Sequence, residues 1–247
     1  MSAQLAQTTQ SLREEILSGV YAPNTRLREN LLAQSMGVSR TLVRLALGTL
    51  EQDGLVAYQD NRGFEVCGFT RDDVFDAIAV RGNLEAMAAR LVAERGVTQK
   101  DLVALDRFVE QMEASLQAGL DTLASRVRWV DLNAGFHDRI VFLSGNRSLR
   151  RAIDHICALP LVSARAVVFN SAAQDHGLPY LRLAQMDHQA IVDAIRNRQG
   201  ARAEALMSEH AHRSVANKRK SFSAMEQDLE APKPTGLPMI SISEYVG

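Results

Sequence analysis

The sequence predicts a mostly α-helical protein in two parts: an N-terminal part with short helices and a small β-hairpin, and a C-terminal bundle built from helices alone. Three observations predict this. The abundant Ala, Leu, Arg, Glu and Gln favour helix. Turn and hairpin signals are confined to about the first 68 residues, and long amphipathic segments follow them. The 247 residues, 46% hydrophobic and 23% charged, exclude disorder over most of the chain.

The N-terminal part follows the order helix, short helix, turn, helix and hairpin. Apolar residues recur at helical spacing over about 5–18, 29–36 and 40–52. Gly37 permits a left-handed backbone where the second and third helices meet, and Ser39 is a good N-cap for the third. Two strand-like stretches, 55–58 and 63–66, flank a polar turn and predict the hairpin. This order predicts a winged helix-turn-helix, with a generic small α+β module as the alternative.

The C-terminal part consists of amphipathic segments bounded by glycine and helix-capping residues. The predicted helices cover 70–95, 98–118, 121–144, 147–171, 178–198 and 200–221. They predict an all-α bundle. We therefore expect a DNA-binding domain over 1–68, a helical domain over 69–222 and a C-terminal tail over 223–247. The proline-rich end of that tail cannot continue a helix, so we expect it to be flexible or loosely docked.

Composition places limits on partners and compartment. The formal net charge is -1, and residues 1–68 hold six arginines against seven acidic residues, so binding to DNA would require a few arginines sorted onto one face. Cys67 and Cys157 make neither a disulfide framework nor a CxxC metal site. No signal peptide and no apolar run of transmembrane length is present. These features predict a cytoplasmic protein without a membrane partner.

The third helix of the N-terminal part carries the side chains that could contact DNA. A recognition helix presents its N-terminal residues to base edges in the major groove. Arginine pairs bidentately with guanine, whereas hydroxyl groups and helix N-termini suit phosphate. The hairpin tip can reach a minor groove or the backbone. The candidate DNA-binding residues are Arg28, Ser39, Arg40, Thr41, Arg44, Arg62 and Gly63. The alternative for each arginine is a solvated surface position.

The same residues carry a family resemblance. The run from Val38 to Arg44 (VSRTLVR), together with Gly54-Leu55-Val56 and Asn61-Arg62-Gly63, resembles the GntR family of bacterial transcriptional regulators over about residues 10–67. The resemblance implies a homodimer on a palindromic operator in double-stranded DNA, with repression as the commoner behaviour. The sequence departs from the family pattern at three positions, which are Asn24, Asn30 and Leu45.

Three of the six histidines lie on separate predicted helices. They are His137, His188 and His210, and Asn133 precedes His137 by four residues, hence on the same helix face. Neutral imidazoles from several helices can converge on a divalent metal ion in a bundle core. Taken singly, each histidine is equally compatible with a hydrogen-bonded core or surface role.

The C-terminal part resembles the helical FCD domain of the FadR subfamily over about residues 72–215. The matching features are Arg81-x-x-Leu84-Glu85, Phe136-His137, Ser144-Gly145-Asn146, the His188–His210 pair and Ala205-Leu206-Met207. The resemblance implies a divalent metal, zinc or nickel, held by His137, His188 and His210. The fourth ligand position falls on Asn133, where the family has aspartate. An amide oxygen cancels no charge, so we expect lower metal affinity and a more positive pocket.

Arg81 is the candidate for binding the carboxylate of a small organic acid effector, because its guanidinium can form a bidentate pair. The alternative is an intrahelical pair with Glu85. The sequence therefore predicts a ligand-responsive regulator that is not an enzyme. Two other functions stay open: a regulator whose effector is the metal itself, and a metalloenzyme using the three histidines, although no catalytic motif such as GxSxG, Walker A or HExxH occurs.

Overall fold

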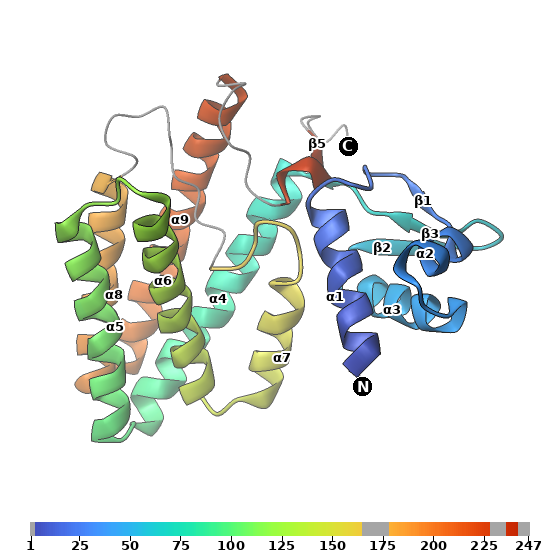
Figure 1. The fold of residues 1–247 in the computed structure, drawn as a ribbon. Coiled ribbons are helices and arrows are strands. Elements are labelled where there is room, and N and C mark those ends of the chain that lie inside the picture. The colour runs from blue at the N-terminus through green and yellow to red at the C-terminus, as the bar shows by residue number, and fades with distance from the viewer. Residues whose placement is uncertain (1–2, 165–177, 228–235, 242–247) are drawn as a thin grey trace. The chain divides into compact units, whose positions relative to one another are not determined.

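The structure is a computed structural model that describes residues 3–164, 178–227 and 236–241 (Figure 1). In this part of the chain, helices dominate and short strands are confined to the two ends. The described residues divide into two compact units. An N-terminal unit holds 3–74, 158–162 and 236–241, and a helical unit holds 75–157, 163–164 and 178–227. The predicted fold class is confirmed.

The N-terminal unit contains three helices and a small antiparallel sheet. The helices are α1 (Ala3–Leu17), α2 (Glu29–Met36) and α3 (Arg40–Gln52), and the strands are β1 (Arg26–Leu27), β2 (Val56–Gln59) and β3 (Gly63–Val66). The sheet has the order β1-β3-β2. The core of the unit contains the fully buried side chains of Leu12, Ile16 and Leu47, together with sheet residues such as Phe64. The helices begin and end within two residues of their predicted limits.

The turn between α2 and α3 sets the direction of α3. Gly37 takes a left-handed conformation (φ 65°) and ends α2, and Val38 packs against the core. The Ser39 hydroxyl then accepts a hydrogen bond from the Leu42 N–H at 3.2 Å, which caps α3. Ala46 and Leu50 are among the residues that turn the opposite face of α3 into the core. The N-terminal end of α3 is therefore presented on the surface of the unit.

The C-terminal segment packs into the N-terminal unit, in contrast to the expected flexible or loosely docked tail. It forms the short helix η1 (Leu237–Met239) and the strand β5 (Ile240–Ser241). Strand β5 pairs in parallel with β4 (Phe69–Thr70), and the Gly236 N–H donates to the Leu17 carbonyl at 2.9 Å. Met239 is fully buried in the core. The final helix also runs to Gln227, so residues 223–227 are helical and do not belong to a tail.

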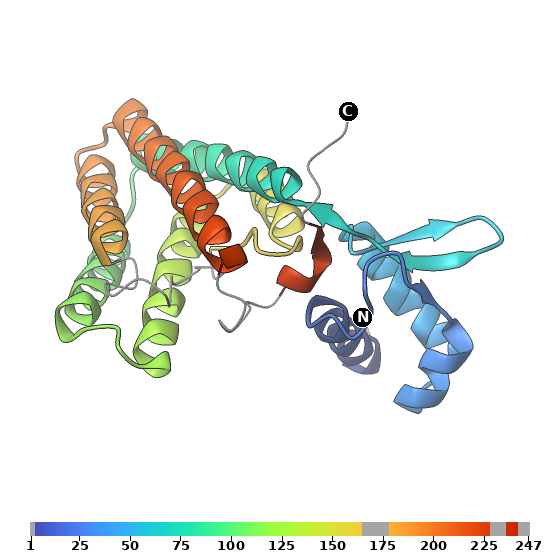
Figure 2. The same cartoon turned by 90° about the horizontal axis from the view of Figure 1, so that it is seen from above.

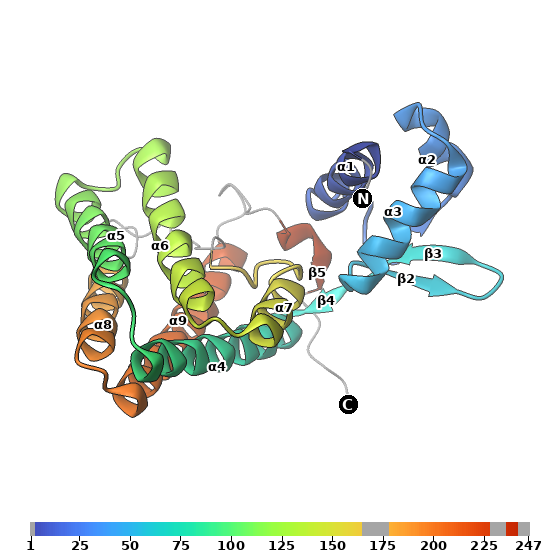
Figure 3. The ribbon, with the colours of Figure 1, turned by 90° about the horizontal axis from the view of Figure 1, so that it is seen from below.

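The helical unit is a bundle built mainly from long helices. It contains most of α4 (Arg71–Arg95), together with α5 (Gln99–Ala118), α6 (Leu123–Leu143), α7 (Arg147–Ile156), α8 (Leu178–Arg196) and α9 (Gly200–Gln227). Helix α5 packs against α6 and α8, and α8 packs against α9 (Figure 3). Helices α4 and α9 approach closely, because a Cβ on Gly82 would lie 2.3 Å from that of Ala211. The side chains of Thr98, Thr122 and Asn146 cap α5, α6 and α7.

Helix α7 ends before the limit predicted for the helix over 147–171, and the prediction is wrong for residues 157–164. The helix ends at Ile156, and Cys157 is its C-cap residue. Pro160 follows closely, and a proline both lacks the N–H that a helix needs and disfavours helical backbone at the preceding residue. Leu161 takes a positive φ of 59°. Residues 165–171 of the predicted helix lie outside the described residues.

Among the described helices, none combines the length and the hydropathy needed to cross a membrane.

Replacing Met239 with alanine should lower the free energy of unfolding of the N-terminal unit by about 2–4 kcal/mol, because it leaves a cavity in a packed core. Urea denaturation followed by circular dichroism measures this. Met186→Ala is the matched control, since the same atoms are removed from a side chain that is 66% exposed. Equal unfolding midpoints for the two variants would contradict the packing of the C-terminal segment.

Candidate functional site

The first candidate site is the outer surface at the start of α3. Ser39, Arg40, Thr41 and Arg44 are all exposed. The side chains of Arg40 and Arg44 are 67% and 62% exposed and lie one helical turn apart. This part of the N-terminal unit therefore offers two guanidinium groups and two hydroxyl groups to an outside partner.

Glu29, at the start of α2, lies beside both arginines. Its carboxylate is 3.3 Å from Nε of Arg44 and 3.9 Å from a terminal nitrogen of Arg40. Ion pairs of exposed side chains contribute roughly 0–1 kcal/mol, so this contact orients the guanidinium groups without removing them from solvent. Sequence reasoning did not single out Glu29, although it directly follows the candidate Arg28.

The hairpin supplies the remaining predicted residues of this face. Gln59 pairs with Gly63, so Asp60, Asn61 and Arg62 form the loop between β2 and β3. Asn61 and Gly63 have positive φ values of 62° and 79°, which produce the tight reversal. The loop extends away from the helices of its unit (Figure 2). Arg62, the residue before β3, is exposed. Arg28 is likewise exposed, immediately before α2.

The second candidate site is a histidine cluster inside the helical unit. His137 on α6, His188 on α8 and His210 on α9 are all buried. The nitrogens that they could offer to a metal ion lie within 4.8 Å of one another. The ring centroids of His188 and His210 are 4.6 Å apart, and those of His137 and His210 are 5.2 Å apart. The structure thus brings together the three histidines that the sequence placed on separate helices.

Two buried carboxylates orient the cluster. Glu85 Oε2 on α4 lies 3.0 Å from Nδ1 of His137, and Asp187 Oδ2 lies 3.4 Å from Nδ1 of His210. Arg213 also pairs with Asp187. A carboxylate at Nδ1 sets the ring orientation and leaves Nε2 as the nitrogen for an ion, an arrangement common around protein-bound metals. From the sequence, Glu85 was a possible partner of Arg81 and part of the family match, whereas no role was predicted for Asp187.

The electrostatics favour a charged carboxylate at Glu85 and neutral imidazoles at His188 and His210. Burial by itself would raise the pKa of Glu85, but Arg81 and His137 lower it to about 2. Burial, and then His210 and His137, lower the pKa of His188 well below its usual range. Burial also lowers the pKa of His210, opposed by the carboxylate of Asp187. Neutral imidazole is the form that binds a metal ion.

His188 provides the test of whether the cluster fits an ion. It is fully buried, and neither of its ring nitrogens has a hydrogen-bond partner among the described residues. Leaving a buried polar atom unpaired costs roughly 1–3 kcal/mol. An ion held by one of these nitrogens would satisfy it, and three imidazoles form an established donor set for zinc. The residues present therefore fit a divalent metal.

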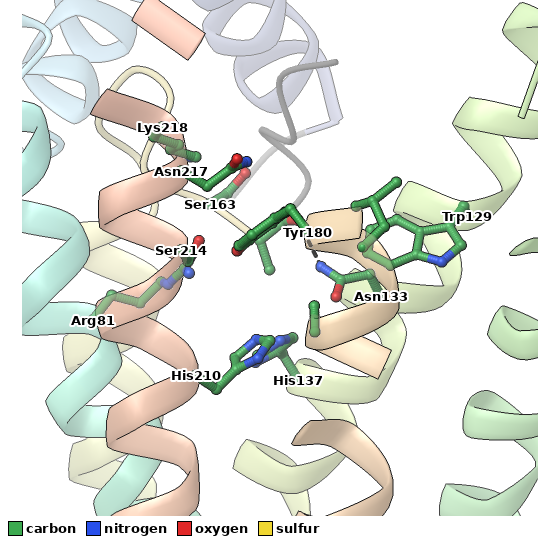
Figure 4. A pocket seen from close by; sticks show the side chains of 13 residues that line it. Arg81, Trp129, Asn133, His137, Ser163, Tyr180, His210, Ser214, Asn217 and Lys218 are labelled. Atoms are coloured by element: carbon green, nitrogen blue, oxygen red, sulfur yellow. Dashed lines mark hydrogen bonds between the residues drawn. The ribbon is translucent and has the colours of Figure 1, made fainter. Parts of the chain in front are cut away.

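Asn133 lies one helical turn before His137 and borders the same cavity as His137 and His210 (Figure 4). Its amide nitrogen donates to the Ala164 carbonyl at 3.1 Å. The amide oxygen is therefore the atom left for an ion. Because it is uncharged, it is a weaker donor than a carboxylate would be.

The cavity beside the cluster is small and carries two buried cations. Its volume is about 30 Å³, which admits no more than one or two water-sized groups without movement of the side chains around it. Arg81 from α4 and Lys218 from α9 line it, together with Tyr180, Ser214 and Asn217 (Figure 4). Nε of Arg81 also lies 3.4 Å from Oε1 of Glu85. Arg81 therefore forms the intrahelical pair with Glu85 and also borders the cavity, so its two predicted roles are compatible.

Lys218 was not a candidate in the sequence analysis, and nothing in its sequence context distinguishes it from its neighbours. Burial, and then the charge of Arg81, lower the pKa of Lys218 to about 7. The remaining histidines do not join the cluster: His155 and His212 are exposed, and His176 lies outside the described residues. The histidine cluster and the cavity beside it are thus formed, among the described residues, by α4, α6, α8, α9 and residues 163–164.

An exposed helix beside a hairpin in one unit, with a helical bundle in the other, is an arrangement typical of DNA-binding transcriptional regulators. Two family models match the chain: "Bacterial regulatory proteins, gntR family" over residues 4–66 and "FCD domain" over residues 76–213. The chain belongs to the GntR family and carries an FCD domain. The relatives that it matches are named as transcriptional regulators, which agrees with the class of protein predicted from the sequence.

Individual relatives agree with this assignment. The HTH-type transcriptional regulator YdhC of Bacillus subtilis is 32% identical over 145 residues, which cover 59% of this chain and 62% of YdhC. The HTH-type transcriptional repressor GlaR of Escherichia coli is 26% identical over 207 residues, covering 81% of this chain and 88% of GlaR. The match spans about three fifths of YdhC and of the Nta operon transcriptional regulator of Aminobacter aminovorans.

A solved structure shows the same fold. Escherichia coli McbR/YncC has a TM-score of 0.63 and 19% identity, and the alignment covers 90% of this chain and all of that chain.

Proposed function

We propose that the protein is a homodimeric repressor that binds a palindromic operator in double-stranded DNA, and that its helical unit binds a divalent metal ion and a small organic acid. One observation carries the proposal. The same chain presents two exposed guanidinium groups on a capped surface helix and holds three buried histidines beside two buried cations. Repression is supported by relatives such as GlaR, which is named as a repressor.

In this proposal, the start of α3 enters the major groove. Arg40 and Arg44 read guanine edges, while Ser39 and Thr41 bond phosphate oxygens. Arg62 and Gly63 at the hairpin tip contact the minor groove or the backbone, and Arg28 contacts phosphate. The exposure of these residues supports the assignment. Two copies related by a two-fold axis would then require two half-sites of opposite direction, hence a palindrome.

In the helical unit, His137, His188, His210 and the Asn133 oxygen hold the ion, with zinc or nickel as the proposed metals. A bound divalent ion would supply a positively charged coordination position for an anionic ligand. Arg81 binds the second side of that ligand through its guanidinium fork. Lys218 adds a further buried donor on the opposite helix. This set of groups favours a small carboxylate over a neutral effector.

One helix of the proposed effector site, α4, begins within the DNA-binding unit. Helix α4 carries Arg81 and begins directly after β4. Helix α9 carries His210, and the chain beyond it returns to pair with β4 through β5. A ligand changes DNA affinity only if it binds two arrangements of the protein unequally. An effector that contacts both α4 and α9 binds with different affinities to two arrangements of these helices.

Arg44→Ala should weaken binding to an operator obtained by selection from random duplexes by about tenfold or more, because each lost bidentate pair costs roughly 1–3 kcal/mol. Gel mobility shifts measure the affinity, and circular dichroism checks the fold. Arg107→Ala, which removes an exposed arginine from α5, is the control and should bind as the wild type does. Unchanged affinity of the Arg44 variant would refute the assignment of α3.

His188→Ala should abolish tight zinc binding in isothermal titration of chelator-treated protein, because it removes one of three imidazole ligands. His212→Ala is the matched control, since it removes an exposed histidine two residues from a proposed ligand. Asn133→Asp should bind zinc about tenfold more tightly, because the carboxylate contributes both charge and a stronger donor. Retained affinity in the first variant, or equal or weaker affinity in the third, would count against the site.

Small carboxylates should raise the melting temperature of the metal-loaded protein by about 5–10 °C at a concentration of 100 times the Kd, since a ligand of the native state alone stabilises it by about 2.7 kcal/mol there. Arg81→Lys should reduce this shift, because lysine keeps the positive charge but cannot form the bidentate pair with a carboxylate. Arg90→Lys is the matched control, because Arg90 lies on the same helix and also pairs with a glutamate four residues later. This variant should keep the full shift in melting temperature.

The same protein distinguishes the metal-sensing alternative. If a chelator alone changes operator affinity and no carboxylate shifts the melting temperature, the metal is the effector and the organic acid has no role.

A further inference from the structure

We propose that Leu45 determines part of the operator sequence by packing against the C5-methyl group of a thymine in the major groove. The inference rests on the proposed function, because it requires α3 to be the helix that enters DNA. It adds an apolar determinant to the polar contacts already assigned to Ser39, Arg40, Thr41 and Arg44.

Leu45 is 55% exposed although it lies in the middle of a helix with a complete apolar face. Val43, Ala46, Leu47 and Leu50 of the same helix are fully buried. The core of the N-terminal unit therefore does not need the side chain of Leu45. Consecutive helical residues are rotated by about 100°. Leu45 and Arg44 are both exposed, so they lie side by side on the outward surface of α3, away from its buried residues.

The neighbouring positions leave Leu45 accessible to a groove wall. Thr41 lies one turn before it, and Gly48 lies nearly one turn after it. A Cβ added at Gly48 would meet nothing within 4 Å, so packing inside the unit does not demand glycine there. Glycine costs about 1 kcal/mol relative to alanine inside a helix. The absent side chain instead leaves space beside Leu45 for a close partner.

The charges around Leu45 identify that partner as nucleic acid. Arg40 and Arg44 lie on the adjacent line of the helix, each more than 60% exposed. A protein partner would have to desolvate these guanidinium groups, whereas phosphates and guanine edges bind them. Among the base edges of the major groove, only thymine offers a methyl group, and an isobutyl side chain cannot hydrogen-bond to the others. Leu45 therefore selects an A·T pair next to the bases read by the arginines.

The test uses the full-length protein and an operator obtained by selection from random duplexes. Each thymine is replaced in turn by deoxyuridine, which removes only the methyl group. At one position in each half-site, the wild type should bind about fourfold more weakly per replaced methyl, the loss expected for one buried methyl group. At every other thymine, replacement should have little effect.

Leu45→Ala should bind the thymine and deoxyuridine operators equally while keeping its preference at the guanines. Leu45→Glu should change the preferred base at that position to cytosine, whose amino group donates to a carboxylate. Leu31→Ala is the matched control: Leu31 is 57% exposed on α2, and its removal should leave the sensitivity to the methyl group intact.

Two results would overturn the inference alone: an operator bound in an Arg44-dependent manner with no methyl-sensitive thymine, or a Leu45→Ala variant as methyl-sensitive as the wild type. A change of oligomeric state in Leu45→Ala, with methyl sensitivity unchanged, would also overturn it and assign Leu45 to a protein contact. Failure to select any operator would overturn the proposed function and this inference together.

Discussion

The helical unit depends on a polar centre that its own side chains satisfy only in part. Three imidazoles, two carboxylates and an arginine are removed from water together, and such groups are costly to bury unless they are paired. Glu85 and Asp187 each face one histidine, which leaves His188 without a hydrogen-bond partner among the described residues. The helices that supply these groups are therefore arranged around a polar site, and their apolar residues pack outside it.

Two of the connections between the helical unit and the DNA-binding unit involve helices that carry residues of this polar centre. Helix α4 leaves β4 directly, and the segment after α9 ends in β5, which pairs with β4. Burial of Met239 makes the last described residues part of the core of the N-terminal unit.

Nucleic-acid recognition here relies on position more than on net charge. The N-terminal segment carries one more acidic residue than basic residues, so no general field attracts DNA. Its acidic residues are partly engaged: Asp53 pairs with Arg13, and Glu29 pairs with the arginines of α3. The exposed outer face of α3 combines two guanidinium groups with an apolar side chain, which together can distinguish base pairs.

The sequence by itself determined the local structure: the helices of the N-terminal unit, the Gly37 turn, the Ser39 cap and the separate helices that carry the three histidines. These features depend on residues close together in the chain, through periodicity, caps and turns. The end of α7 near Pro160 was readable in the same way, although the predicted helix extended past it. Only the tertiary structure decided that Asp187 and Glu85 face the histidines, that Lys218 lies beside Arg81, and that Met239 fills the core of the first unit. Those outcomes depend on contacts between distant residues, because helix packing and not local spacing selects which buried groups meet.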